Sequence, residues 1–464
     1  MRNIFRTILL VALVVPSTGS LAGQLPQATV DRIDAIATKA LADTGAPSAS
    51  IAILKDGKIA YLKAYGNARL EPPTPASPEM RYSIGSVSKQ FLAGAILLLV
   101  QEGKLSLEDR VARFLPSLTR ASDITLRQLL SHTSGYQDYY PLDYVAPFML
   151  QSVTTEGILD RWAKKALDFD PGSDWQYSNT NYVVAGRIVE QVAGMPLMAF
   201  LESRIFHPLG MQSPIDLDAH SLSSSDAAGY TRFGLGPLRS APPEAPGWLF
   251  AAGELAMTAR DLALWDQSLM EGNLLTPAML QEMARPQQLR NGAPVNYGLG
   301  VGISNASGHP KLEHGGAVSG FVSDNAIWLD KGVAAVALTN LDGSEAARSI
   351  VEQIGAWLVL EQLDPQAHQA LEQARQILRD LQQGRIDRSL LTSDADSYFT
   401  PQVLADAASS LKPLGNPASF EQTSFQMRGG MAYRHFRIGF GSGKSLRLST
   451  FSTPDGKLAQ YLIQ

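Results

Sequence analysis

The chain has 464 residues, 45% of them hydrophobic and 18% charged, which is typical of a folded protein with sizeable cores and favours at least two domains. Its formal net charge of -5 provides no basic surface for nucleic acid or anionic lipid, so neither is an expected partner. Cysteine is absent, which excludes disulfides, a thiol nucleophile and thiolate metal sites.

The N-terminus has the three parts of a secretory signal peptide. Arg2 and Arg6 precede an apolar run from Ile8 to Val15, and small residues follow it. We expect residues 1–22 to be removed by cleavage near Ala22. The apolar run is far shorter than the ~20 residues of a spanning helix, so no stable membrane span is expected after signal removal. The alternative is a permanent anchor. In a bacterial source the mature protein would be periplasmic or secreted.

The mature chain begins with a helix followed by a hairpin. Apolar residues recur at a helical period over residues 28–41, and two strand-like runs follow at 48–54 and 59–65. Asp56 and Gly57 lie between the two runs and suit a tight turn with positive φ angles. Residues 90–100 are apolar on nearly every face, which predicts a helix buried in the middle of the protein.

The middle of the chain, residues 105–289, alternates short helical patterns with Pro, Gly and Ser-rich connections and predicts a helical lobe with long loops. Strand patterns return afterwards and a closing helix ends the segment. The simplest fold is α+β, an antiparallel sheet built from both ends of residues 23–362, flanked by helices, with the helical lobe inserted. The late strands are expected at 297–303, 320–328 and 333–339, and the closing helix at 346–362.

Residues 363–464 predict a separate, smaller α+β module. A polar helical stretch at 366–383 precedes four strands, and the pattern weakly resembles the helix and curved sheet of cystatin-like or nuclear-transport-factor-like domains. Nothing in this module suggests a reaction of its own. Arg434, His435 and Arg437 share one strand and are expected on an exposed polar face. We consider a role in shaping the active-site mouth or in dimer formation. The four strands are expected at 419–427, 431–440, 445–451 and 457–463.

Ser86 and Lys89 form a Ser-x-x-Lys pair at the start of the predicted buried helix. Residues three apart on a helix share a face, so the amine should lie within hydrogen-bonding distance of the hydroxyl. A serine becomes a nucleophile only when a base takes its proton, and a lysine can do so when burial keeps it neutral. Taken alone, this pattern occurs on many helix surfaces.

Tyr177-Ser178-Asn179 is the second chemical pattern, in a loop ahead of a helix predicted at 182–192. A phenol beside a lysine ammonium can be held as a phenolate and can relay a proton, and the amide of Asn179 can orient an amide of the substrate. The alternative for the tripeptide alone is an aromatic turn that leads into the helix.

His314-Gly315-Gly316 is the third pattern, ahead of the strand expected from residue 320. Glycines at a sheet edge let a substrate lie against the backbone, and an amide there can join the amide of Ser86 in binding an oxyanion. His314 would supply a cation or hydrogen-bond donor to the substrate. The alternative is a plain turn.

The order and spacing of these three patterns resemble the penicillin-recognising serine enzymes. Within that group the Tyr-x-Asn form is similar to class C β-lactamases and to related D-alanyl-D-alanine carboxypeptidases, D-aminopeptidases and esterases. Further likeness lies in residues 129–135, 251–253, 258–262 and 297–300, which we interpret as scaffold that includes a structural His132. The resemblance implies that Ser86 is acylated, that Lys89 and Tyr177 share proton transfer, and that Asn179, His314, Gly315 and Gly316 bind the substrate.

One departure from that group matters: His314-Gly315-Gly316 stands where true β-lactamases have Lys-Thr-Gly, a variant that resembles D-aminopeptidases. The loss of a fixed charge weakens the case for efficient penicillin hydrolysis.

We therefore expect an exported serine hydrolase, a peptidase or amidase acting on small-molecule or short-peptide substrates of the D-amino-acid or penicillin type. The alternatives are a carboxylesterase on the same scaffold and a non-catalytic penicillin-binding-like protein. No cofactor is expected. No metal is expected either, because the seven histidines show no cluster at ligand spacing.

Overall fold

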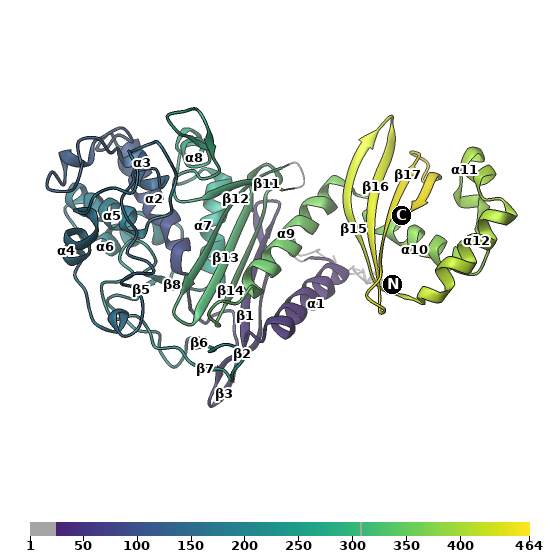
Figure 1. Ribbon diagram of the computed structural model, residues 1–464, viewed down its shortest axis with the longest axis horizontal. Helices are drawn as coiled ribbons and strands as arrows, with labels where there is room; N and C mark the ends of the chain where they lie inside the picture. The colour runs from purple at the N-terminus through teal and green to yellow at the C-terminus, as the bar shows by residue number, and fades with distance from the viewer. Residues whose placement is uncertain (1–24, 307–308) are drawn as a thin grey trace, which may run out of the picture.

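The computed structural model describes residues 25–306 and 309–464. The predicted signal peptide at 1–22 lies outside the described residues. Figure 1 shows a large α+β part joined through α9 (Ala346–Leu363) to a smaller part that holds the C-terminal sheet.

The large part is built on a seven-stranded antiparallel sheet in the order β11-β12-β13-β14-β1-β2-β3. β1 pairs with β14, which confirms that both ends of this part share one sheet. Asp56 and Gly57 form the β1–β2 turn with φ of 54° and 71°, as their sequence predicts. The strands are β1 (Ser48–Lys55), β2 (Lys58–Leu70), β3 (Pro73–Pro75), β11 (Gly302–Ala306), β12 (His309–Val318), β13 (Phe321–Trp328) and β14 (Val333–Thr339).

Helices cover both faces of this sheet. α1 (Gln27–Thr44) and α9 lie on one face, where Ile33, Ile51 and Val351 belong to one core. The other face carries the helical lobe and α7 (Ala259–Glu271). α2 (Ser88–Gln101), the helix predicted at 90–100, is buried over almost its whole length in the core of the lobe side. A helix enclosed in this way can fix a side chain rigidly at its N-terminus.

The lobe contains short helices and long loops, as predicted, together with short strands that no sequence pattern indicated. One of them, β4, ends just before the Ser86 turn and belongs to a three-stranded sheet in the order β4-β8-β5. The helices are α3 (Leu126–Leu130), α4 (Thr155–Ile158), α5 (Asn179–Ala193), α6 (Leu197–Leu201) and α8 (Pro277–Met283). The short strands are β4 (Tyr82–Ser83), β5 (Ile215–Asp216), β6 (Tyr230–Thr231), β7 (Arg239–Ser240), β8 (Leu255–Met257), β9 (Gln287–Gln288) and β10 (Pro294–Val295).

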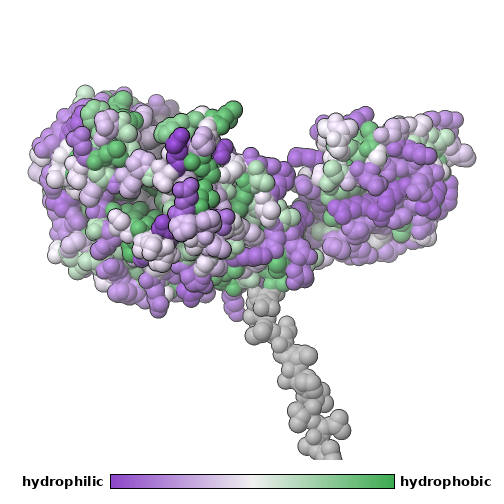
Figure 2. All heavy atoms as spheres, turned by 90° about the horizontal axis from the view of Figure 1, so that it is seen from below, coloured by the Kyte–Doolittle hydropathy of each residue, from purple (hydrophilic) through white to green (hydrophobic). Residues whose placement is uncertain are grey.

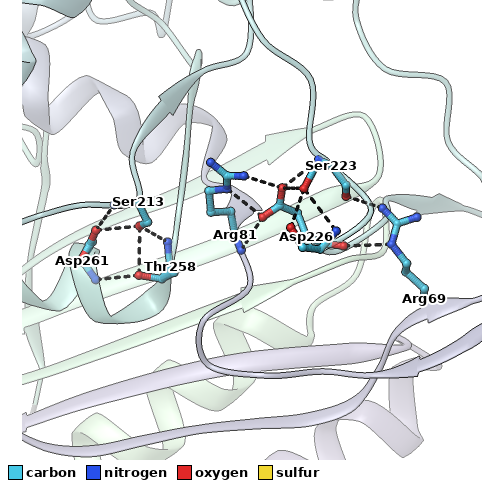
Figure 3. Close-up of polar contacts among 8 residues, drawn as sticks. Arg69, Arg81, Ser213, Ser223, Asp226, Thr258 and Asp261 are labelled. Carbon is cyan, nitrogen blue, oxygen red and sulfur yellow. Dashed lines mark hydrogen bonds and ion pairs between the residues drawn. The ribbon is translucent and has the colours of Figure 1, made fainter.

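A partly buried ion pair anchors the chain just before β4. Nε and Nη2 of Arg81 each donate to the Asp226 carboxylate at 2.8 Å, and Ser223 Oγ donates to the same carboxylate at 2.7 Å (Figure 3). Arg69, from β2, donates to the backbone carbonyls of Ser223 and Asp226. Arg69 and Arg81 thus connect β2 and the start of β4, which belong to different sheets, to the loop at 223–226. The two parallel hydrogen bonds from Arg81 fix the geometry of its ion pair.

The observed positions of β11 and β12 differ from the two strand predictions made for this segment. We predicted a strand over 297–303 and none over 309–318; the structure has β11 at Gly302–Ala306 and a ten-residue β12. Pro310, Gly315 and Gly316 disfavour strands intrinsically, and tertiary pairing with β11 and β13 overrides that preference. His314-Gly315-Gly316 thus lies inside a strand rather than ahead of one.

The C-terminal part is a four-stranded antiparallel sheet in the order β15-β16-β17-β18, with α10 against one face. Its core contains Ile377, Phe436, Ile438 and Leu448. The sequence patterns did not predict α11 and α12, which are both short. Thr392 and Thr400 are the N-cap residues of these two helices. The elements are α10 (Ala367–Gln382), α11 (Ser393–Tyr398), α12 (Pro401–Leu411), β15 (Pro417–Arg428), β16 (Met431–Phe440), β17 (Ser445–Ser452) and β18 (Leu458–Ile463).

Arg434 does not lie on an exposed face, contrary to expectation. It is 2% exposed, and its Nε and Nη2 donate to the Asp364 carboxylate at 2.6 and 2.7 Å. Strand alternation puts Arg434 on the inner face with Phe436, while His435 and Arg437 face outward. Figure 2 shows hydrophilic residues over much of the visible surface of this part. The pair joins the end of α9 to β16.

Within the described ranges, no single helix is long and apolar enough to cross a membrane. The bent pair formed by α5 and residues 197–206 reaches that threshold by length and composition only.

Candidate active site

A cleft of about 550 Å³ opens beside Ser86 and contains most of the predicted site residues in its walls. Ser86, Tyr177, Asn179 and the residues of β12 from His314 to Gly316 line it. Lys89 is fully buried directly behind Ser86. Every lining residue lies between positions 86 and 348, so the C-terminal part adds nothing to this wall within one chain.

Ser86 lies in the 3₁₀ turn Gly85–Val87 that leads into α2, and Lys89 follows in the first turn of the helix. Lys89 Nζ is 2.9 Å from Ser86 Oγ, and it also donates to Asn179 Oδ1 at 2.8 Å and to the Ala252 carbonyl at 2.6 Å. Burial lowers the pKa of Lys89 to about 7, against the opposing charges of two buried carboxyls. Near neutral pH, a large fraction of the amine is therefore free to accept the serine proton.

Two glycines allow β12 to approach the serine turn. A Cβ on Gly316 would stand 1.9 Å from the Ile84 carbonyl oxygen, and one on Gly85, which has a φ of 50°, would stand 2.8 Å from the Ala317 nitrogen. The Ala317 amide is thereby placed beside the Ser86 turn. We expect the amides of Ser86 and Ala317 to form the oxyanion-binding pair. The sequence indicated an amide near the glycines but not which one.

Tyr177 is half-buried in the loop before α5 and hydrogen-bonds with the Ser86 hydroxyl. Lys89 Nζ lies 5.0 Å from the centre of its ring. Desolvation raises the pKa of Tyr177 well above its ordinary value, which outweighs the opposing hydrogen bond from Ser86. The raised pKa favours the phenol over the phenolate, and the phenol is the form suited to donate a proton.

His132 forms hydrogen bonds with the backbone on both sides of Tyr177. Its Nδ1 accepts the Ser178 N–H at 3.1 Å, and its carbonyl accepts the Gln176 N–H at 3.0 Å. The imidazole is buried, and burial, with the Lys89 charge adding to it, lowers its pKa well below the ordinary value, so it is neutral. The sequence suggested only a scaffold role for His132, and nothing in its motif revealed that it contacts the segment carrying Tyr177.

Asn179 bridges Lys89 to Asp138. The Oδ1 of Asn179 accepts a hydrogen bond from Lys89, and its Nδ2 donates to both carboxylate oxygens of Asp138 at 3.2 Å. The backbone N–H of Asn179 also donates to Oδ1 of Asp138, at 3.0 Å. The amide is thus oriented by the protein, with its oxygen toward the amine. Asp138, which no sequence motif marked, also lines the cleft, and burial raises its pKa.

His314 is not a cation in the cleft wall, contrary to one of the two expected roles. It is buried, and burial together with the Lys89 charge lowers its pKa to about 4. Its Nδ1 lies 2.7 Å from the Gly315 carbonyl oxygen, which can only accept, so Nε2 accepts from the Tyr297 hydroxyl at 2.8 Å. Both ring nitrogens are therefore occupied by the protein.

The fold and this cleft define a hydrolase of the serine type. The chain belongs to the Beta-lactamase family, whose model matches residues 33–356. This confirms the resemblance that the three motifs indicated. Among the described residues, no group of three or more histidines and carboxylates is placed to hold a metal ion.

Three similar proteins illustrate the range of the family. The chain is 27% identical to penicillin-binding protein 4* of Bacillus subtilis, over 61% of this chain and 66% of that protein. It is 28% identical to a D-aminopeptidase of Brucella anthropi, over 64% and 56%. A solved D-stereospecific amidohydrolase from Streptomyces sp. is 29% identical with a TM-score of 0.61, covering 68% of this chain and 97% of that one. The chain thus spans less than two thirds of these curated relatives.

Proposed function

We propose that this protein is an amidase or peptidase for D-amino-acid substrates that works through an acyl-enzyme on Ser86. The observation that carries the proposal is the hydrogen bond from a fully buried lysine of lowered pKa to the Ser86 hydroxyl. The similarity to a D-aminopeptidase and to a D-stereospecific amidohydrolase supports the substrate class.

In the proposed acylation, neutral Lys89 takes the Ser86 proton while Oγ bonds to the amide carbon. The amides of Ser86 and Ala317 hold the oxyanion. Tyr177 donates its proton to the leaving nitrogen as the C–N bond breaks, and Lys89 returns the first proton to Tyr177. Water then attacks the ester by the reverse relay, which gives the free acid and restores Ser86.

The test is hydrolysis of D-alanine p-nitroanilide against its L-isomer by the mature protein, with Ser86→Ala as control. We expect release of p-nitroaniline from the D-isomer at least tenfold faster, and none from the variant. Faster hydrolysis of the L-isomer, or equal turnover by the variant, would contradict the proposal.

We further propose that residues 1–22 export the protein and that residues 363–464 form an accessory module of cystatin-like or nuclear-transport-factor-like type. The short basic and apolar start supports export. N-terminal sequencing of the expressed protein tests it: a start near residue 23 is expected, and an intact Met1 would refute cleavage. Superposition of a solved structure of the module on both domain types tests the second proposal.

A further inference from the structure

The cleft extends from the nucleophile around the open edge of β12. β11 pairs only with residues 309–313 of that strand, so residues 314–318 have β13 on one side and the cleft on the other. Ser86 lines this cleft, and so do Asp324 of β13 and Arg348 in the first turn of α9. Residues on both faces of the strand pair β12–β13 therefore line one cleft.

Alternation along β12 assigns its residues to opposite faces. Gly316 lies against the Ile84 carbonyl on the serine side, whereas a Cβ on Gly315 would lie 3.7 Å from Asp324 Oδ2 on the α9 side. Gly315 therefore leaves the Asp324 carboxylate uncovered. A side chain at position 315 would stand between that carboxylate and the cleft.

Asp324 is half-buried and, among the described residues, has neither a hydrogen-bond nor an ion-pair partner for its carboxylate. Lys311 of the neighbouring strand β12, whose charge acts on Asp324, is already engaged with Glu313 at 2.5 Å and Glu352 at 2.6 Å. Arg348, on α9, is exposed and forms no ion pair with it. A desolvated carboxylate without a partner is costly, and a cationic ligand would remove that cost.

The other carboxylates of the cleft differ in this respect. Asp138 accepts a hydrogen bond from Asn179. Glu313 forms an ion pair with Lys311 and accepts a hydrogen bond from Ser304. Glu345 is exposed, so solvent screens its charge.

We propose that Asp324 binds a substrate ammonium group carried on the side chain of a residue flanking the scissile amide. This rests on the proposed function and adds a preference for lysine-like residues. The four-carbon stem of a lysine-like side chain carries its ammonium farther from the scissile carbonyl than an α-ammonium lies, which suits a carboxylate on the α9 face of β12.

Four dipeptides test the proposal with the full-length mature protein: D-Ala-D-Lys and D-Lys-D-Ala, each against its norleucine counterpart, with products measured by liquid chromatography and mass spectrometry. In one of the two positions, we expect kcat/KM at pH 8 to be roughly tenfold or more higher for lysine. Asp324→Asn should lose this preference and leave the norleucine peptides unchanged, while Asp324→Glu should keep it. Glu345→Gln, an exposed cleft carboxylate, is the matched control and should change the preference less than about twofold.

The pH provides a second readout. Burial, with Glu313 and Glu352 adding to it and Lys311 and Arg348 opposing, raises the pKa of Asp324 to about 7. Its carboxyl is neutral below that pH and charged above it, so the lysine preference should grow from pH 6 to pH 8 in the wild type and stay flat in Asp324→Asn.

Two results overturn the subsite alone: hydrolysis with no lysine preference in either position, or a preference that survives in Asp324→Asn with an unchanged melting temperature. Failure to cleave all four peptides, together with no adduct at Ser86, would instead overturn the proposed function and the subsite with it.

Discussion

The imidazole of His132 lies 4.2 Å from the ring of Tyr177, centre to centre, with 33° between the two planes. The same imidazole accepts the N–H of Ser178, so one buried side chain contacts both the ring of Tyr177 and the backbone of the next residue. His132 is thus a positioning residue for the phenol that we assign to proton transfer.

His132→Ala should lower kcat/KM for D-alanine p-nitroanilide roughly 10- to 100-fold, because Tyr177 loses its contact and proton transfer depends on its position. His132→Asn keeps an acceptor for the Ser178 N–H and should recover part of the loss. Steady-state kinetics on folded protein, with unfolding followed by circular dichroism, separates position from stability. Full activity in a destabilised His132→Ala would refute the positioning role.

Lys89 should govern the acid limb of the pH profile. Its pKa is lowered to about 7, and only the neutral amine can take the serine proton, so kcat/KM should rise as pH passes upward through about 7. Lys89→Ala should lose roughly 10²- to 10⁴-fold in rate together with this limb. Tyr177→Phe should have a lower kcat/KM but should keep the acid limb of the pH profile. An unchanged limb in Lys89→Ala would assign the base to another group.

The two glycines of β12 should respond differently to a methyl group. Gly316→Ala forces a Cβ to 1.9 Å from the Ile84 carbonyl and should cost about 1–3 kcal/mol of stability and most activity. Gly315→Ala meets nothing closer than 3.7 Å and should fold normally. Chemical denaturation and p-nitroanilide assays compare the two. Equal behaviour of both variants would contradict the placement of β12 against the serine turn.

The Arg434–Asp364 pair should matter for stability and not for catalysis. Arg434→Ala leaves a buried carboxylate unpaired and should cost about 3–5 kcal/mol in the free energy of unfolding. The exposed neighbour on the same strand, Arg437→Ala, should change it by at most ~0.5 kcal/mol. Urea denaturation measures both, and kcat/KM should match the wild type. Equal stabilities would show that the pair is not buried in solution.

Local patterns predicted the residues that local geometry controls. Ser86 and Lys89 are three positions apart, so helical geometry alone brings their side chains together, and the apolar run that buries α2 is continuous in sequence. The Asp56-Gly57 turn and the strands it joins are similarly local.

The features that sequence could not provide depend on distant contacts. Asp138 contacts Asn179 across the lobe, and Ala317 reaches the serine turn only because β12 forms in spite of its glycines. The charge states of Tyr177 and His314 could not be predicted from sequence because they depend on burial, which is a property of the folded cleft. Arg434 was misjudged for the same reason, since its partner Asp364 is far away in sequence.

Intact-protein mass spectrometry after rapid quenching with a D-alanine ester tests the central claim most directly. The account predicts a mass increase equal to one D-alanyl group, mapped by peptide digestion to the segment that contains Ser86 and absent from Ser86→Ala. An adduct that persists in Ser86→Ala, or steady turnover by that variant, would contradict it.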